Sequence, residues 1–238
     1  MTTRILALLS IASVAGAQPR AVMAKAEPHH HLVFEDATMR ILRVRVPAHD
    51  STMLHQHDPD YFWIALGPST IVNAKLGTPE TTVTSEDLSI HYTPGKFAHV
   101  ARNPGNRPFD NITIELLGTQ SGLHPLCDAV SSDPLDCPPG DSAPKIFTGA
   151  IERPSFQTKS LRVSLVTIDP GKTLESNEPK RATWIIALDT LDTKSARSLS
   201  VDAGGKWIGG TFASSSSAWS LTNHATHAVR ALAVVRRD

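Results

Sequence analysis

Three histidines stand at spacings that suit a metal centre. His55 and His57 are separated by one residue, and His99 follows a Pro94-Gly95 pair further along the chain. In an extended strand alternate side chains point to the same face, so His55 and His57 can enter one cavity. A Pro-Gly turn that feeds a second strand would bring His99 opposite this pair. Three neutral imidazoles at one point suit zinc, copper, iron or nickel and leave positions open for water or substrate.

Short strand-like runs surround these histidines. They are β-branched or alternating, and Pro, Gly, Asp and Asn separate them, whereas long helical periodicity is absent. Many short strands at close spacing predict an all-β sandwich or barrel. The runs are His31–Phe34, Met39–Pro47, Tyr61–Leu66, Thr70–Leu76, Glu80–Val83, Leu88–Tyr92 and Asn111–Leu117.

The second half of the chain repeats the first. A shift of 122 residues aligns Tyr61–Leu66 with Thr183–Leu188 without a gap. A shift of 120 residues then aligns Asn103 with Asn223. The matches fall mainly on apolar strand positions, where a shared core would keep them. Further matched pairs are Phe34 with Phe156, Met39 with Leu161, Arg40 with Arg162, Ile41 with Val163, Val44 with Val166, Val46 with Ile168, and Ile112 to Ile114 with Leu232 to Val234.

The candidate metal ligands are missing from the second repeat. The residues that take the places of His55, His57, Asp60 and His99 are Asn177, Pro179, Ala182 and Trp219, respectively. The apolar framework without its ligands predicts a second domain kept for packing or for shaping a site. His224 and His227 follow the place equivalent to His99 and are not counted as ligands.

The two histidine motifs resemble those of the cupin superfamily, G-x5-H-x-H-x3,4-E-x6-G and G-x5-P-x-G-x2-H-x3-N. The matched residues are His55, His57, Gly67, Pro94, His99 and Asn103. The resemblance implies a double-stranded β-helix (jelly-roll) barrel in which His55, His57 and His99 bind a divalent metal, be it iron, zinc, manganese, nickel or copper. With the repeat, it implies an all-β protein of two tandem cupin-type barrels. It also implies pairing of edge strands in a homodimer.

The glutamate of the first cupin motif is absent. Counting back from Gly67 reaches Asp60, and counting forward from His57 reaches Tyr61. Neighbouring strand residues face opposite ways, so only one of the two can point at the metal. The hard carboxylate of Asp60 is slightly preferred, and either residue is a candidate catalytic base. A third alternative is a site of three histidines alone, which the resemblance allows because some cupin dioxygenases use one.

Two further clusters are given structural interpretations. His29, His30 and His31 are expected to lead into the first strand without a catalytic part, since adjacent strand residues face opposite ways. Cys127 and Cys137 lie in a segment rich in Gly, Ser, Asp and Pro, which reads as a linker. In an oxidising compartment they are expected to form a disulfide.

The first residues have the pattern of a secretory signal peptide. Arg4 precedes the apolar run Ile5 to Val14, and Ala15-Gly16-Ala17 matches the small-x-small cleavage rule. Such a run is too short to span a bilayer, which needs about 20 apolar residues, and no later segment qualifies. We therefore expect a periplasmic or secreted protein without a membrane span.

The charge balance and the domain plan complete these expectations. Lys plus Arg equals Asp plus Glu, at 23 each, which gives no electrostatic reason to expect nucleic acid as a partner. The expected domains are a signal peptide (1–17), a metal-binding barrel (18–117), a linker (118–145) and a degenerate barrel (146–238). The expected partner is a small-molecule substrate or ligand. The protein is then either a metal-dependent enzyme, such as a dioxygenase, or a non-catalytic small-molecule-binding, metal-binding or structural protein of the cell envelope.

Overall fold

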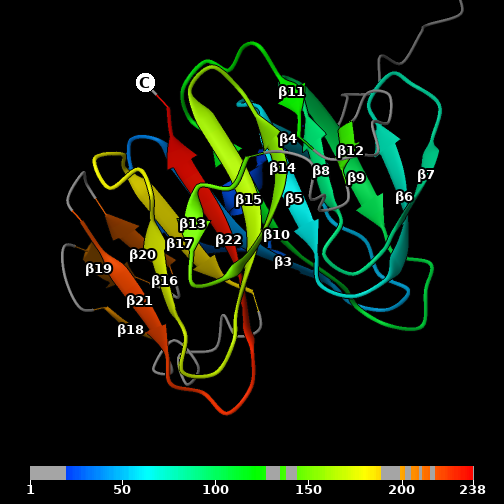
Figure 1. The fold of residues 1–238 in the computed structure, drawn as a ribbon. Helices are drawn as coiled ribbons and strands as arrows, with labels where there is room; N and C mark the ends of the chain where they lie inside the picture. Colours follow the sequence, from blue (N-terminus) through cyan, green and yellow to red (C-terminus); the bar gives the residue numbers. More distant parts are fainter. Residues whose placement is uncertain are drawn as a thin grey trace, which may run out of the picture.

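The computed structural model describes residues 20–126, 135–137, 144–188, 199–201, 205–208, 211–214 and 218–237. Within these ranges the chain consists almost entirely of strands, with one short 3-10 segment, η1, at Ala24–Ala26 (Figure 1). The all-β prediction is confirmed. No helix in these ranges has the length and apolar character needed to cross a membrane. The predicted signal peptide, Cys127 and the side chain of Cys137 lie outside the described residues, so the disulfide stays a prediction.

The first half of the chain forms two facing sheets. The outer N-terminal sheet has five strands in the order β1 (Val22–Met23), β4 (His55–His57), β9 (Phe97–Arg102), β6 (Ser69–Lys75) and β7 (Thr81–Ser85). The inner N-terminal sheet has six strands in the order β12 (Leu135–Cys137), β8 (Ile90–Thr93), β5 (Tyr61–Ala65), β10 (Phe109–Leu116), β3 (Met39–Val46) and β2 (His30–Glu35).

The second half forms another such pair. The inner C-terminal sheet has seven strands in the order β11 (His124–Pro125), β14 (Ile151–Gln157), β15 (Leu161–Ile168), β22 (Val229–Arg236), β17 (Thr183–Ala187), β20 (Thr211–Ser214) and β19 (Gly205–Ile208). The outer C-terminal sheet has four strands in the order β13 (Phe147–Thr148), β16 (Thr173–Ser176), β21 (Ser220–Asn223) and β18 (Leu199–Val201).

Strand pairing repeats with the register that the sequence alignment predicts. Phe34 pairs with Ile41 after a register shift in β2, and Phe156 pairs with Val163 after the equivalent shift in β14. In the same way β10 pairs with β5, and β22 pairs with β17, at equivalent residues. Because even the bulge recurs, the two halves share one framework.

The central strands of the two inner sheets, β5 and β17, are nearly all apolar because both of their faces are buried. In β5, Phe62 and Ile64 point to a core between the two inner sheets, whereas Tyr61, Trp63 and Ala65 point toward the outer N-terminal sheet. Alternate residues of a strand face opposite sides, so burial of both faces removes the usual polar alternation.

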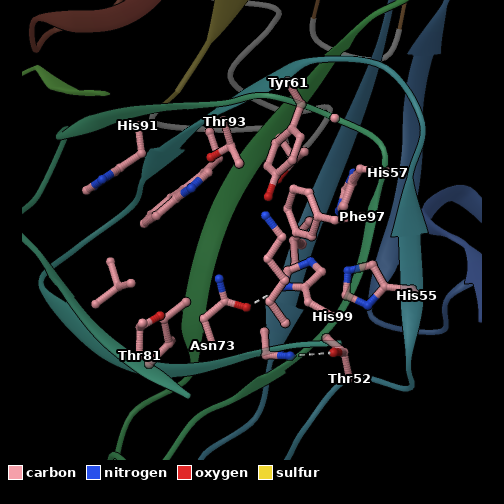
Figure 2. A pocket seen from close by; sticks show the side chains of 18 of the residues that line it. Thr52, His55, His57, Tyr61, Asn73, Thr81, His91, Thr93, Phe97 and His99 are labelled. Carbon is pink, nitrogen blue, oxygen red and sulfur yellow. Dashed lines mark hydrogen bonds between the residues drawn. The ribbon is translucent and has the colours of Figure 1, made fainter. Parts of the chain in front are cut away.

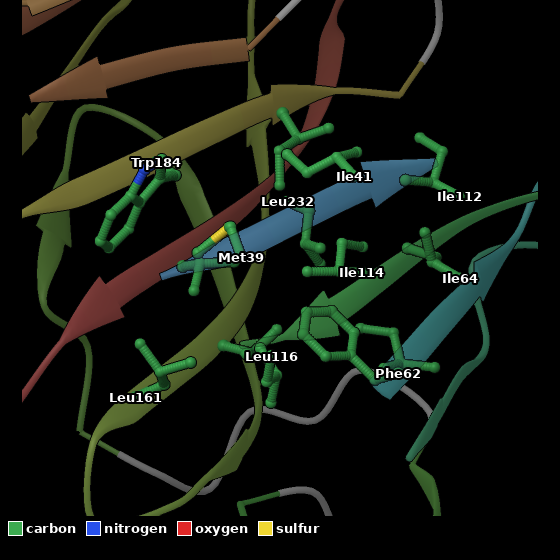
Figure 3. Close-up of a cluster of buried hydrophobic side chains, with 14 of the residues drawn as sticks. Met39, Ile41, Phe62, Ile64, Ile112, Ile114, Leu116, Leu161, Trp184 and Leu232 are labelled. Carbon is green, nitrogen blue, oxygen red and sulfur yellow. The ribbon is translucent and has the colours of Figure 1, made fainter. Parts of the chain in front are cut away.

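The core between the inner sheets joins the two halves (Figure 3). Phe62 packs edge-to-face on Phe156, with ring centroids 5.2 Å apart, and neither ring is exposed to solvent. Figure 3 shows Met39, Ile41 and Ile114 of the first half gathered in one cluster with Leu161 and Leu232 of the second half. The repeated apolar positions therefore meet each other across the centre of the molecule.

Part of the predicted linker joins the sheets on either side of it. β11 pairs with β14 of the inner C-terminal sheet, and β12 pairs with β8 of the inner N-terminal sheet. The segment therefore contributes an edge strand to each half, which its Gly- and Pro-rich composition did not predict.

Candidate metal centre

Strands β4 and β9 bring the three predicted histidines together. The two strands are antiparallel and His55 pairs directly with His99. His57 lies on the same face as His55, and all three rings are buried. The His99 ring centroid is 4.3 Å from that of His55 and 5.5 Å from that of His57 (Figure 2). The convergence expected from the H-x-H spacing and the Pro-Gly turn is present.

The turn before β9 is held in place by short contacts. The amide of Lys96 donates to the His57 carbonyl oxygen at 2.7 Å, and that of Gly95 donates to Asp60 Oδ1 at 3.0 Å. A Cβ atom on Gly95 would lie 2.3 Å from the Pro59 carbonyl oxygen, so only glycine fits there. This turn fixes the start of β9 and with it the position of His99.

A fourth histidine, His30, lies in the same cluster. Its ring centroid is 4.6 Å from that of His55, and one nitrogen each of His30, His55 and His57 lie within 4.8 Å of one another. His30 begins β2 and pairs with Val44, whose side chain faces the same inter-sheet space. The expectation that the His29 to His31 run has no part in the site is therefore wrong for His30, although the exposed side chain of His31 fits it.

Each of the four rings uses Nδ1 for a hydrogen bond to an oxygen. His55 Nδ1 lies 2.9 Å from the Met53 carbonyl oxygen and His57 Nδ1 lies 3.0 Å from Glu115 Oε1. The other two contacts are His30 Nδ1 to Glu27 Oε2 at 2.5 Å and His99 Nδ1 to Asn73 Oδ1 at 2.7 Å. This is the arrangement of metal-binding histidines, in which one ring nitrogen donates to an oxygen and the other is left to coordinate.

The remaining nitrogens of the cluster match a metal ion. His55 Nε2 and His99 Nε2 are buried and have no hydrogen-bond partner in the part of the chain that the structure describes. An unpaired buried polar atom is costly, which favours a ligand that takes up both lone pairs. The described residues therefore fit a divalent metal, and the histidine cluster supports metal binding.

Burial keeps these imidazoles neutral. It lowers the pKa of His55 to about 3, with further lowering from the neighbouring His30 and His57. Burial also lowers the pKa of His57 and takes that of His99 well below its usual value. Since only a neutral imidazole coordinates a metal, protons compete weakly at this site near neutral pH.

A buried carboxylate supports the cluster from behind. Glu115 accepts a hydrogen bond from Arg40 as well as from His57, and no part of its side chain is exposed. Burial alone would raise the pKa of Glu115, but the contacts with His57 and Arg40 lower it overall, so the group is a carboxylate. Its charge orients the His57 ring and fixes its tautomer.

The two candidates for a fourth ligand lie in different places. Asp60 accepts hydrogen bonds from Tyr92 Oη, at 2.6 Å, and from the Gly95 amide, and it does not line the cavity beside the histidines. It secures the turn before β9, and the structure does not support it as ligand or base. Tyr61 does line the cavity and stacks on His57, with centroids 4.2 Å apart.

The histidines open onto a cavity of about 290 Å³ between the outer and inner N-terminal sheets. Figure 2 shows His55, His57 and His99 on one side of it and His91 on the other. His91 stacks on Trp63, with centroids 3.9 Å apart. The volume is near the lower end of the range for small-molecule pockets, about 300 to 1,000 Å³.

Comparison with known proteins supports the fold. No family model matches the sequence, and no curated protein matches it. Among solved structures, AerE from Microcystis aeruginosa has a TM-score of 0.64 at 12% identity, covering 89% of this chain and 94% of its own. Oxalate decarboxylase from Bacillus subtilis has a TM-score of 0.54 at 11% identity, covering 95% of this chain and 79% of its own.

These likenesses and the strand order define the chain as a protein of the cupin fold with a histidine cluster that fits a metal. At such low identity they show the fold and not the activity.

Proposed function

We propose that this protein is an exported bicupin metalloenzyme, whose N-terminal barrel binds one divalent metal ion through His55, His57 and His99. The single observation that carries the proposal is the pair of buried Nε2 atoms on His55 and His99, which have no hydrogen-bond partner among the described residues. His30 forms a group with His55 and His57 in which one ligand nitrogen of each lies within 4.8 Å of the others, so it is a further candidate ligand. The repeated strand register supports domains near 18–117 and 146–238, and the Arg4-led apolar N-terminus supports export.

The residues around the cavity would hold a substrate beside the metal. A bound divalent metal would supply Lewis acidity and, if redox-active, electrons for oxygen chemistry. Burial raises the pKa of Tyr61 by more than the hydrogen bond with Thr93 lowers it, so this phenol stays protonated at neutral pH. Tyr61 is therefore suited to donate a hydrogen bond to a substrate oxygen, and it is poorly suited to act as a base.

A second candidate function is a non-catalytic protein that binds metal or a small molecule. It is favoured by one specific observation: none of the described residues lining the cavity is Asp or Glu. A reaction that begins with proton abstraction needs a base, and the lining offers no carboxylate for it.

Oxygen uptake by the untagged, iron-loaded protein separates the two functions. We expect consumption with one class in a panel of diketones, phenols and thiols, and we expect a Tyr61→Phe variant to be slower with the same metal content. If the iron-loaded protein consumes oxygen with none of these compounds, the dioxygenase proposal is wrong and the non-catalytic function is preferred. The Lys172→Met variant, altered on the exposed surface of the other half, serves as control.

A further inference from the structure

We propose that the cavity binds a small organic anion, whose charged end lies between the metal position and the ammonium group of Lys75. The inference rests on the proposed metal centre and adds to it the charge class of the ligand. Lys75 is the one lysine or arginine among the described residues that line the cavity, and that lining includes no carboxylate. The charge offered to a ligand is therefore positive.

Strand β6 places Lys75 next to the histidine cluster. Lys75 is the direct cross-strand partner of His99, and its neighbour two residues back, Asn73, hydrogen-bonds His99 Nδ1. Side chains at i and i+2 share one face of a strand, so Asn73 and Lys75 both face the cavity. Paired residues lie about 5 Å apart at Cβ, which puts the flexible Lys75 chain within reach of a molecule beside His99.

The Lys75 side chain is held over the cavity by an aromatic ring. Its ammonium nitrogen lies 4.4 Å from the centroid of Phe97, which itself lines the cavity and contacts His57 and His99. Such a cation–π contact is worth about 0.5–1 kcal/mol at an exposed site, which is enough to bias the rotamer and too little to prevent ion pairing. The residue as a whole is exposed, so it marks the solvent side of the cavity.

The charge balance of the site also calls for an anion. Imidazole ligands bring no negative charge to a metal, so a divalent ion held by His55, His57 and His99 would keep both of its charges. The carboxylates of Glu27 and Glu115 lie behind the rings, and Arg40 pairs with both Glu115 and Glu35. On the cavity side of the rings a divalent ion and, at the solvent edge, Lys75 would both be positive with no carboxylate in the described lining, and an anionic ligand would compensate this charge.

The far wall of the cavity suits the apolar part of such a ligand. Trp63 and His91 form a flat stacked pair there, and the apolar residues Ile71, Val83 and Phe109 also line the cavity. A planar or apolar body against the Trp63–His91 pair would direct a carboxylate or phenolate end toward His99, opposite His91 in Figure 2, and toward Lys75, the cross-strand partner of His99. Size and charge together favour compounds such as small aromatic or branched carboxylates.

The test uses the untagged protein loaded with Co(II), with benzoate and its neutral analogue benzamide as probes. Binding is measured from the visible spectrum of the bound Co(II) and by calorimetry. We expect benzoate to change the spectrum and to bind at least tenfold more tightly than benzamide. Lys75→Met should weaken benzoate binding about tenfold, the scale of one charge-assisted hydrogen bond, and leave benzamide and the Co(II) content unchanged.

The control and the contrary outcomes are distinct. Lys172→Met removes an exposed lysine of the other half and should bind benzoate like the wild type. If Co(II) is bound but benzoate and benzamide bind alike, or Lys75→Met leaves benzoate affinity unchanged, the anion proposal is wrong and the metal centre stands. If the protein does not retain Co(II), both proposals fail.

Discussion

The two halves of the chain use the same strand framework for opposite purposes. In the N-terminal half the space between inner and outer sheets is lined by imidazoles and encloses a cavity. In the C-terminal half the corresponding space is filled by apolar side chains. Trp219 takes the place of His99 there and packs against Phe147 and Phe212, with centroids 6.2 Å and 5.3 Å away.

The shared features show which parts of the motif are structural. Asn103 donates from Nδ2 to the carbonyl oxygens of Val46 and Arg107, and Asn223 donates in the same way to those of Ile168 and His227. The asparagine thus ties a turn in both halves, with or without histidines nearby. The strand framework therefore forms without the histidine cluster, whereas the cluster needs side chains that only the N-terminal half has.

The largest expected effect concerns the core that the halves share. Phe62→Ala should lower the free energy of unfolding by about 3–5 kcal/mol, because the deleted ring is fully buried against Phe156. Since the core includes residues of both halves, urea unfolding should remain a single transition. Leu32→Ala, at a side chain that is 54% exposed, should change stability by less than about 0.5 kcal/mol. Two separate transitions, with only one shifted, would show instead that the halves fold independently.

The next effect is acid sensitivity, which we expect from the N-terminal half alone. The pKa of His55 is lowered to about 3 in the folded protein, so below pH 6.5 the unfolded chain binds more protons. Below about pH 6 the metal-free protein should therefore lose stability at a rate that approaches about 1.4 kcal/mol per pH unit for each such histidine, and about half as much between pH 7 and 6. Unfolding at pH 7, 6 and 5 measures this slope, which should be smaller by that amount in His55→Gln. An unchanged slope in the variant would contradict the burial of a neutral His55.

A smaller effect, on metal affinity, distinguishes Glu115, which contacts His57, from Glu35, which contacts Arg40. Glu115→Gln keeps the shape but weakens the contact that orients His57, and it should reduce metal affinity about 10- to 100-fold in chelator competition. Glu35 also pairs with Arg40 but does not touch a histidine, so Glu35→Gln is the matched control. Equal affinities for the two variants would mean that Glu115 has only a structural part.

The smallest effect tests the structural reading of the repeated asparagine. Asn103→Ala and Asn223→Ala should each cost about 1–2 kcal/mol, because each leaves two or more turn carbonyls without a donor. Both variants should keep the wild-type metal content. A loss of metal in Asn103→Ala at full stability would place this residue in the site after all.

The sequence predicted most of the framework because its signals are local. Strands around Tyr61 to Leu66 and Asn111 to Leu117 were recognisable from composition, and the observed limits differ by one or two residues. His55 and His57 could be placed on one face by the strand period alone. His99 required only that the Pro-Gly turn start an antiparallel strand, as it does.

His30 and Asp60 were misjudged because their positions depend on long-range packing. His30 reaches the cluster because β2 pairs with β3. The three consecutive histidines alone do not show which of them faces the space between the sheets. Asp60 shares a strand face with Phe62 and Ile64, and that face meets the other half of the molecule. Which face of β5 borders the cavity could not be known before the two inner sheets were seen to pack together.

The metal content of the protein, purified without a tag, tests the contrast between the halves most directly. We predict one divalent ion per chain by elemental analysis, and close to none in His57→Ala, whereas Asn177→Ala in the second half should keep the full complement. A wild-type protein that holds no metal, or a His57→Ala variant that keeps all of it, would contradict the assignment of the centre to these histidines.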